Sequence, residues 1–399
     1  DGEIEEAMRR RDKEGGTREE LARKLGLPRD RRPAGNAFEY VDTRTVPRAA
    51  GKNFTVRHVR WRAFGDVYGS GVIFEPDDEP RWNLIAIPDA DQDPETICGL
   101  PPRRDVPATT SYVPRLAEAG CRVLVPVLIN RSEIHAMPAR EWLHRSAWEL
   151  GRTLAGYEVQ KVLAAVDCLA SAPPSRTGKL GVVGWGEGGR LALYAAALDP
   201  RIDGALVSGY FGPRGRVWDE PADRTVFGLL RGHSDAEIAG LIAPRPLIIE
   251  HGVYPEAGFR LDAQGKPERL ARGAGKRGKP GKLLVPTLAE AKEESGKIGS
   301  AEDAVEFRET GRALADESLL SLLRHLGGKV PEKLPAGELG EFSEPVSDGE
   351  FVAARHAGQM AEIDHHNQWA LIDSQRVRGG LFGKVNTKSL EGFEESIAP

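Results

Sequence analysis

The chain has 399 residues, which is long enough for one large domain or two smaller ones. Its 55 basic and 60 acidic residues give a net charge of −5, which argues against nucleic acid as a partner, because nucleic-acid-binding proteins usually carry a basic excess. The longest apolar run, residues 191–198, is far shorter than the ~20 residues that span a bilayer, so no membrane span is predicted. Three cysteines without paired spacing predict neither a disulfide framework nor a zinc site.

Residues 1–36 form a polar, charge-rich N-terminal segment, in which we expect one short helix. Thr17 followed by Glu20 is typical of a helix start, and Leu21 and Leu25 follow at helical spacing.

An antiparallel hairpin is predicted next. Apolar and polar residues alternate over residues 54–64, Gly65-Asp66 turns the chain, and a second apolar-rich run covers residues 67–74. This period of two, interrupted by a turn, is typical of two paired strands.

Beyond the hairpin, short apolar runs alternate with amphipathic stretches up to residue 327. This alternation predicts an α/β fold with a doubly wound, mostly parallel sheet covered on both faces, entered by the hairpin, over residues 37–327. The expected strands are residues 84–87, 123–127, 180–183, 205–207, 247–249 and 305–307. The expected helices are residues 112–119, 141–150, 157–170, 188–198, 236–242 and 316–326.

Three further segments differ from this pattern. Residues 255–282 are crowded with Gly, Lys and Arg, which favours a solvated insertion over a polyanion site. Residues 328–350 are polar and rich in Gly, Pro and Glu, and are predicted to be a linker. A helical C-terminal extension is expected over residues 351–399, helical to about residue 377.

The most informative motif is the turn Gly184-Trp185-Gly186-Glu187-Gly188, which joins a buried strand to an Ala- and Leu-rich helix. A strand, a tight turn and a helix form the nucleophile elbow G-x-S-x-G, in which small neighbours let the two backbones approach. The central position here is Gly186, which tolerates the unusual backbone angles but has no hydroxyl or thiol. The motif therefore predicts the geometry of an elbow without its nucleophile.

A dinucleotide-binding turn is the competing interpretation, with Gly184, Gly186 and Gly189 in the G-x-G-x-x-G register. Two observations disfavour it. The strand is about the fourth of the sheet rather than the first, and the expected acidic residue would fall near Asp203, before a strand rather than after one.

The remaining members of a catalytic triad are not evident. Glu250 or Glu256 could occupy the acid position after the late strand, and His251 there is expected to be a polar loop residue. No histidine follows the last expected strand, where residues 309–316 read ETGRALAD. His365 and His366 could reach the site only if the C-terminal extension folds back.

The loop after the strand at residues 84–87 reads PDADQDPE over residues 88–95. In an active relative this loop supplies an oxyanion-hole amide, and carboxylates beside an oxyanion would oppose its charge. The acids resemble the opening of a calcium loop, but Pro94 stands where that loop needs Gly. We therefore expect a solvated acidic loop, no metal site and no cofactor, with a residual pocket near Asp89, Ala90, Glu250 and His251.

Several blocks of the sequence together resemble a known family. They are residues 156–167, the Gly184–Gly189 turn with residues 191–203, residues 208–213 and residues 243–249. Over residues 37–399 the chain resembles the dienelactone hydrolase and acetyl xylan esterase-like branch of the α/β-hydrolases. More narrowly, it is similar to the N-terminal half of large bacterial proteins that carry two such domains in tandem.

That resemblance implies a first domain with Gly at the nucleophile position, attached to a C-terminal catalytic hydrolase domain that is not in this chain. It also implies a small ester or carbohydrate as ligand, and a periplasmic or extracellular location. The alternative is an ester hydrolase with a different nucleophile, for which Ser208 is the candidate. Ser208 lacks the elbow and an evident base, and serines after strands are usually turn residues.

Overall fold

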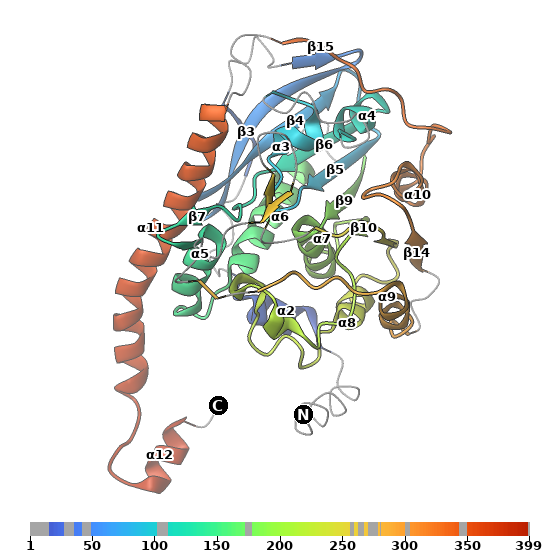
Figure 1. Ribbon diagram of the computed structural model, residues 1–399. Coiled ribbons are helices and arrows are strands. Elements are labelled where there is room, and N and C mark those ends of the chain that lie inside the picture. Colours follow the sequence, from blue (N-terminus) through green and yellow to red (C-terminus); the bar gives the residue numbers. More distant parts are fainter. Residues whose placement is uncertain are drawn as a thin grey trace.

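One large sheet, with eleven strands in the described part of the chain, forms the centre of the fold (Figure 1). The computed structural model describes residues 16–27, 36–41, 49–101, 111–171, 178–255, 259–261, 267–269, 278–279, 281–299, 304–342 and 349–397. The strands follow the order β14-β11-β10-β9-β5-β6-β4-β3-β2-β15, and β1 pairs with β3. Their bounds are β1 (Glu39–Tyr40), β2 (Ala49–Gly51), β3 (Phe54–Phe64), β4 (Val67–Pro76), β5 (Trp82–Ile87), β6 (Cys121–Pro126), β9 (Lys179–Trp185), β10 (Gly204–Ser208), β11 (Leu247–His251), β14 (Val305–Glu309) and β15 (Leu339–Phe342).

The sheet is parallel in one part and antiparallel in the other. Neighbouring strands are parallel from β14 to β6. They are antiparallel from β6 to β15, a part that contains the long β3–β4 hairpin. The predicted α/β sheet and its entry hairpin are therefore confirmed, and the sheet as a whole is mixed, with the parallel strands in one part. Two small two-stranded sheets lie outside it, formed by β7 (Glu133–Ile134) with β8 (Met137–Pro138) and by β12 (Phe259–Leu261) with β13 (Pro267–Arg269).

Helices cover both faces of the sheet (Figure 1). One face packs on α2 (Arg18–Leu25), α5 (Ala139–Trp148), α6 (Leu154–Ser171), α7 (Glu187–Leu198) and α8 (Asp235–Gly240). The other packs on α3 (Pro94–Cys98), α4 (Val113–Glu118) and α10 (Asp316–Leu326). The remaining helices are α9 (Leu288–Ser295), α11 (Gly349–Phe382), α12 (Leu390–Ile397) and the single turns η1 (Val217–Asp219) and η2 (Ala222–Arg224).

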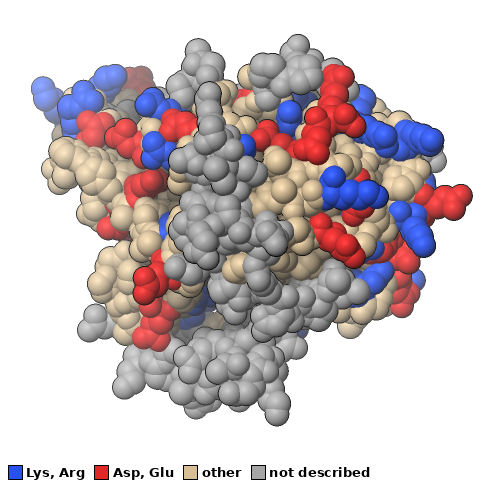
Figure 2. Space-filling view, turned by 90° about the horizontal axis from the view of Figure 1, so that it is seen from above, with Lys and Arg blue, Asp and Glu red and all other residues tan. Residues whose placement is uncertain are grey.

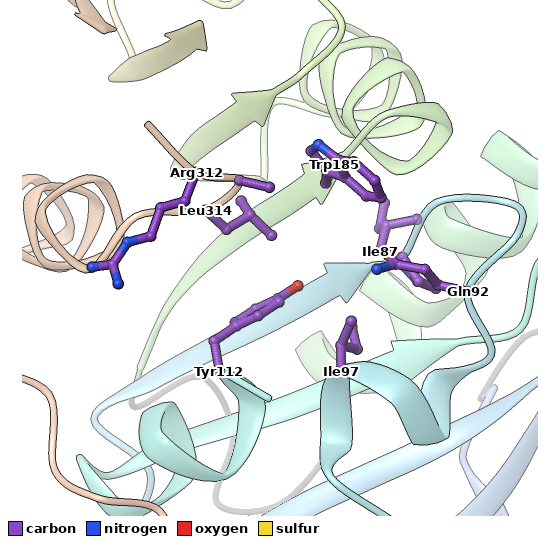
Figure 3. A pocket seen from close by; sticks show the side chains of 9 residues that line it. Ile87, Gln92, Ile97, Tyr112, Trp185, Arg312 and Leu314 are labelled. Atoms are coloured by element: carbon purple, nitrogen blue, oxygen red, sulfur yellow. The ribbon is translucent and has the colours of Figure 1, made fainter. Parts of the chain in front are cut away.

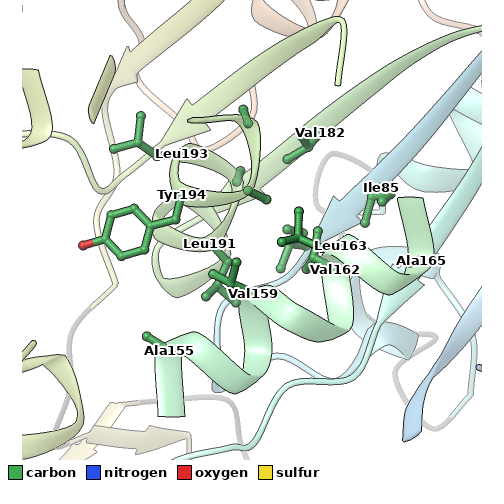
Figure 4. Packing of buried hydrophobic residues seen from close by; sticks show 14 of the residues in the cluster. Ile85, Ala155, Val159, Val162, Leu163, Ala165, Val182, Leu191, Leu193 and Tyr194 are labelled. Atoms are coloured by element: carbon green, nitrogen blue, oxygen red, sulfur yellow. The ribbon is translucent and has the colours of Figure 1, made fainter. Parts of the chain in front are cut away.

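The side chains of each strand alternate between the two faces of the sheet, so the core has two layers. Ile85 and Val182 face α6 and α7, where they meet Val162 and Leu191 (Figure 4). Their chain neighbours, such as Leu84 and Val183, face α4 and α10 on the opposite side. Successive side chains of a strand point to opposite faces, so uninterrupted apolar strands are expected wherever both faces are covered.

The N-terminal helix is part of the domain core. Its predicted capping box is present, because Thr17 Oγ1 accepts from the backbone N–H of Glu20 and the Glu20 carboxylate accepts from the N–H of Thr17. Leu21 and Leu25 are fully buried against the face that α6 and α7 cover.

The C-terminal part of the chain differs from its prediction in two respects. Within the expected linker, β15 adds to the edge of the sheet beside β2, and Leu334 is buried. The extension is helical as predicted, but α11 runs further, to Phe382, and α12 follows it. The first half of α11 packs on β4 and α5, and the rest extends past the end of α5, where Arg378 donates to the carbonyl oxygen of Glu149 at 2.7 Å (Figure 1).

Much of the Gly-, Lys- and Arg-rich segment at residues 255–282 lies outside the described residues, so its solvated character stays a prediction. Lys279, which is described, donates from Nζ to the carbonyl oxygens of Trp218 and Glu220, both at 2.6 Å. Among the described residues, no helix is long and apolar enough to cross a membrane. On the face seen in Figure 2, basic and acidic side chains are interspersed.

We expect Leu25→Ala to lower the free energy of unfolding by about 2–5 kcal/mol, because it leaves a cavity under α2. The exposed Leu390 of α12 is the matched control, and Leu390→Ala should change stability by less than about 0.5 kcal/mol. Urea denaturation measures both. Equal effects would show that α2 is not part of the cooperative core.

Candidate functional site

The turn between β9 and α7 has the geometry of a nucleophile elbow. Gly186 stands at its apex with φ +60° and ψ −117°, a conformation that a residue with a side chain holds only under strain. Its N–H donates to the carbonyl oxygen of Ser208 at 3.0 Å, and its own carbonyl accepts from the N–H of Arg190 at 3.1 Å. A Cβ on Gly188 would collide with the carbonyl oxygen of Ile87, so the predicted need for small residues around the apex is confirmed.

A carboxylate occupies the space above this apex. Asp89, in the loop after β5, is 1% exposed, and its Oδ1 accepts from the backbone N–H of Glu187 at 2.8 Å. A Cβ added to Gly186 would collide with Asp89 Oδ1 and lie 2.6 Å from Cγ of Pro255. The Asp89 side chain thus takes the place where a nucleophile's side chain would project.

The same carboxylate binds an amide that an oxyanion hole would use, the N–H of Glu187 after the elbow apex. Within its own loop it also accepts from the N–H of Asp91, at Oδ2 and 3.1 Å. A negative charge made by the protein itself is therefore bound where an active hydrolase stabilises one that develops during reaction.

Arg131 neutralises this buried carboxylate. Its Nη1 lies 2.7 Å from Asp89 Oδ2 and 2.8 Å from Asp91 Oδ2. Burial alone would raise the pKa of Asp89, but the Arg131 charge and the amide hydrogen bonds outweigh it, so the pKa lies below its usual value. The carboxylate is ionised at neutral pH.

These contacts correct the expectation of a solvated acidic loop at residues 88–95. Asp89 is buried at the elbow, and Glu95 is buried between Arg355 of α11, at 2.8 Å, and His58, at 3.7 Å. Two acids of the loop are thus internal because cations from distant parts of the chain meet them.

Glu187, directly after the apex, anchors the start of α7. Its carboxylate pairs with Arg140 at 3.2 Å, with Arg190 at 3.1 Å and with Arg224. Burial alone would raise the pKa of Glu187, but the three guanidinium groups lower it well below its usual range. A carboxylate held in this way has a structural role under the elbow.

The candidate acid Glu250, which the structure places within the end of β11, is also hydrogen-bonded to the backbone. Glu250 accepts from the Ser208 hydroxyl at 2.6 Å, from the N–H of Leu314 at 2.6 Å and from the N–H of Ala315 at 2.9 Å. It therefore fixes the loop after β14, which in active relatives carries the triad histidine. Glu256, the other candidate acid, lies outside the described residues.

The histidines singled out in the sequence have other partners. His251 Nε2 lies 3.1 Å from the carbonyl oxygen of Pro286, and its ring packs beside Tyr254. The C-terminal extension does fold back, but His366 packs edge-on against the rings of Phe64 and Tyr157, and the His365 ring contacts Trp369.

A cavity of about 120 Å³ lies beside the elbow (Figure 3). None of Asp89, Ala90, Glu250 and His251, near which a pocket was expected, is among its lining residues. Its walls come from the end of β5, from α3, from the residue before α4, from Trp185 and from the loop after β14. The lining residues are Ile87, Pro88, Gln92, Ile97, Tyr112, Trp185, Arg312, Ala313 and Leu314.

Strand order and known relatives agree on the fold. From β3 to β14 the strands lie side by side in the order β3-β4-β6-β5-β9-β10-β11-β14. Numbered one to eight along the chain, this is the order 1-2-4-3-5-6-7-8, and only the second strand, β4, runs antiparallel to the others. The model of the dienelactone hydrolase family matches residues 105–234, which include the elbow. The chain therefore has the α/β-hydrolase fold. No curated protein matches the sequence.

Solved structures of α/β-hydrolases resemble the chain at low sequence identity. A candidate acetyl xylan esterase from Bacteroides fragilis aligns with a TM-score of 0.50 and 14% identity, covering 73% of each chain. A glucuronoyl esterase from Solibacter usitatus aligns with a TM-score of 0.46 and 15% identity, covering 78% of this chain and 92% of that one. Likeness at this identity extends to the fold alone.

Two residues of this α/β-hydrolase site had no place in the sequence prediction. Arg131 lies in the segment after β6. Because β5 and β6 are parallel neighbours, the segments after them meet at the same edge of the sheet, and a cation in one could have been predicted to pair with the acids in the other. Nothing in the sequence indicated that Tyr112 lines a cavity, because it was expected only as the first residue of a helix.

We expect Asp89→Asn to lower the free energy of unfolding by about 1–3 kcal/mol at pH 7, because the buried Arg131 then keeps only the more exposed Asp91 as its counter-charge. The pKa of Asp89 is lower in the folded protein than the value of about 3.9 expected in the unfolded chain. Ionised Asp89 therefore contributes its full share to the free energy of unfolding above about pH 4, and this share is lost as the pH falls through the folded pKa. The difference in the free energy of unfolding between the wild type and Asp89→Asn should therefore become smaller below about pH 4.

Urea denaturation from pH 7 to pH 3 measures this gap. Asp373 is the matched control, because its ion pair with Arg376 is exposed, and Asp373→Asn should cost less than about 1 kcal/mol at every pH. A gap for Asp89→Asn that stays constant with pH would contradict an ionised, stabilising Asp89.

Proposed function

We propose that this chain is a non-catalytic α/β-hydrolase domain that binds a small ligand and supports a catalytic hydrolase domain as its partner. The observation that carries the proposal is the Asp89 carboxylate above Gly186, bound to the amide that follows the elbow apex. It fills the space that an attacking group and a developing oxyanion would need.

The surroundings of the elbow support the same proposal. A nucleophile needs a base within hydrogen-bond reach, and no histidine occurs in the loop after β14. Glu250, where a triad acid would orient that histidine, instead accepts two backbone N–H groups of the loop. The absence of a hydroxyl or thiol at Gly186, the absence of a histidine in the loop after β14 and the occupied Glu187 amide together support the proposal.

The part of α11 from Trp369 to Phe382 supports a partner domain. Four large apolar side chains on it are exposed: Trp369 at 60%, Ile372 at 62%, Val377 at 52% and Phe382 at 72%. They lie around the helix rather than on one face, so a partner that contacts this part of α11 would have to surround it. The family resemblance makes a hydrolase domain of the same superfamily the expected partner.

Ester hydrolysis by another nucleophile is the second candidate function. The Ser208 hydroxyl donates to Glu250 at 2.6 Å, which is the contact of a serine with a carboxylate base. Against it, Ser208 is 1% exposed, and the same carboxylate already accepts two backbone N–H groups.

We expect the purified chain to hydrolyse p-nitrophenyl acetate no faster than buffer, because the elbow offers no attacking group. Ser208→Ala should leave this background rate unchanged. Ser321→Ala is the matched control, since the Ser321 hydroxyl also donates to a carboxylate, that of Glu306, at 2.6 Å. Turnover that Ser208→Ala abolishes and Ser321→Ala retains would establish the esterase function in place of the proposal.

Gly186→Ser should not create an esterase, because no base is positioned to activate the new hydroxyl. It should also destabilise the fold by more than the ~1–2 kcal/mol of a positive φ, since the new Cβ collides with Asp89. Gly151→Ser is the matched control: its φ is +67°, with no atom within 4 Å of an added Cβ. Thermal denaturation and the same ester assay measure both variants, and substantial turnover by Gly186→Ser would reveal a base that the proposal lacks.

A further inference from the structure

A second cavity, of about 270 Å³, lies between α11 and the β3–β4 hairpin. It shares no lining residue with the cavity beside the elbow, and β4 lies three strands from β9 in the sheet. Val41, which lines it, is 51% exposed, so the cavity is open to solvent. An apolar cavity of about 150 Å³ holds benzene, so the larger volume suits a molecule of about ten or eleven heavy atoms.

The wall that α11 forms has open space over Gly358. A Cβ added to this glycine would meet no atom within 4 Å. Ala354 and Phe351, about one and two turns earlier on the helix, add apolar side chains to the same wall. The wall can therefore contact the apolar part of a ligand.

Arg355, in the same wall, carries hydrogen-bond donors without acceptors among the described residues. Its side chain is 7% exposed, and Nη2 donates to the Glu95 carboxylate at 2.8 Å. Nε and Nη1 are buried and have no hydrogen-bond partner, although the Phe351 ring lies 5.4 Å from the guanidinium. Buried polar groups are normally hydrogen-bonded, so unpaired donors in the wall of a cavity indicate an acceptor on a ligand.

Two other charged side chains of the lining already have partners. Arg60 Nε donates to Glu39 at 2.7 Å, and Glu362 Oε2 accepts from the backbone N–H of Tyr68 at 2.9 Å. Glu362 follows Arg355 by seven residues, which is about 10 Å along the helix. Its negative charge therefore lies away from the unpaired donors.

Glu95 holds one nitrogen of the Arg355 guanidinium in place. Burial alone would raise the pKa of Glu95, but His58, which lines the cavity, and Arg355 lower it to about 2. Glu95 therefore stays ionised and keeps Nη2 occupied, while Nε and Nη1 need a second acceptor. A carboxylate suits them best, because hydrogen bonds between two charged groups are stronger than those to a neutral acceptor.

We propose that the cavity between α11 and the β3–β4 hairpin binds a monocarboxylate with a compact apolar body. Its carboxylate accepts from Nε and Nη1 of Arg355, and its body fills the space over Gly358. The ligand completes the hydrogen bonding of a buried guanidinium. The inference goes beyond the proposed function, because the site lies away from the elbow and does not depend on its chemistry.

3-Phenylpropanoate and 3-phenylpropanamide test the proposal, because they have the same size and shape and differ in charge. Titration into the full chain, followed by ligand-observed NMR, should give a dissociation constant for the acid about tenfold lower than that for the amide. Arg355→Lys should weaken binding of the acid about tenfold, because lysine keeps the charge beside Glu95 but has one nitrogen in place of three. Arg376→Lys is the matched control on the same helix and should leave binding unchanged, because Arg376 is 82% exposed and pairs with Asp373.

A second variant tests the site without changing a charge. Gly358→Leu places a side chain in the open space and should abolish binding of 3-phenylpropanoate. It should not destabilise the fold, because leucine favours a helix interior more than glycine does. Gly379→Leu, also on α11 and with no atom within 4 Å of an added Cβ, is the matched control and should bind as the wild type does.

Thermal denaturation shows whether the variants fold, and if Arg355→Lys does not, Gly358→Leu and the comparison of acid with amide still decide. Equal binding of the acid and the amide, no binding of the acid, or full binding by a folded Arg355→Lys or Gly358→Leu chain would overturn the proposal. The ester assay tests the non-catalytic function separately, since none of these outcomes concerns the elbow.

Discussion

The buried ion pair between Asp89 and Arg131 is the interaction on which this edge of the sheet depends. It brings the loop after β5 onto the turn after β9 and ties both to the segment after β6. A buried carboxylate is tolerated because a guanidinium and two amides meet it, and removing any of them would leave a polar group without compensation. The carboxylate therefore organises three loops through one group.

A second set of charges supports the elbow from below. Arg140 joins Glu158, Glu187 and Asp223, all of them buried, and so links α5 and α6 to the start of α7 and to η2. Such networks add little net stability compared with apolar packing, but they define one geometry sharply when every member is paired. These buried charges thus hold the start of α7, and with it the elbow, in one geometry.

The elements were predictable because they depend on local pattern. The apolar runs of β5, β9 and β11 and the period of β3 each indicated their own strand, and the glycines around Gly186 indicated a tight turn. The site was less predictable because it depends on pairing between distant segments. Asp89 was expected in solvent, and only the adjacency of β5 and β6 brings Arg131 to it. Likewise, β15 forms in an expected linker because β2 offers it an edge.

Positions 89 and 186 constrain each other. The aspartate fits against the turn only because the opposite residue has no Cβ, and a larger residue at the turn requires a different side chain in the loop. Substitution of Gly186 alone meets a collision, and substitution of Asp89 alone removes one of the two carboxylates that pair with Arg131, so the two positions are expected to change together. In an alignment of related sequences this coupling would appear as covariation, with glycine at the turn accompanying an acid in the loop.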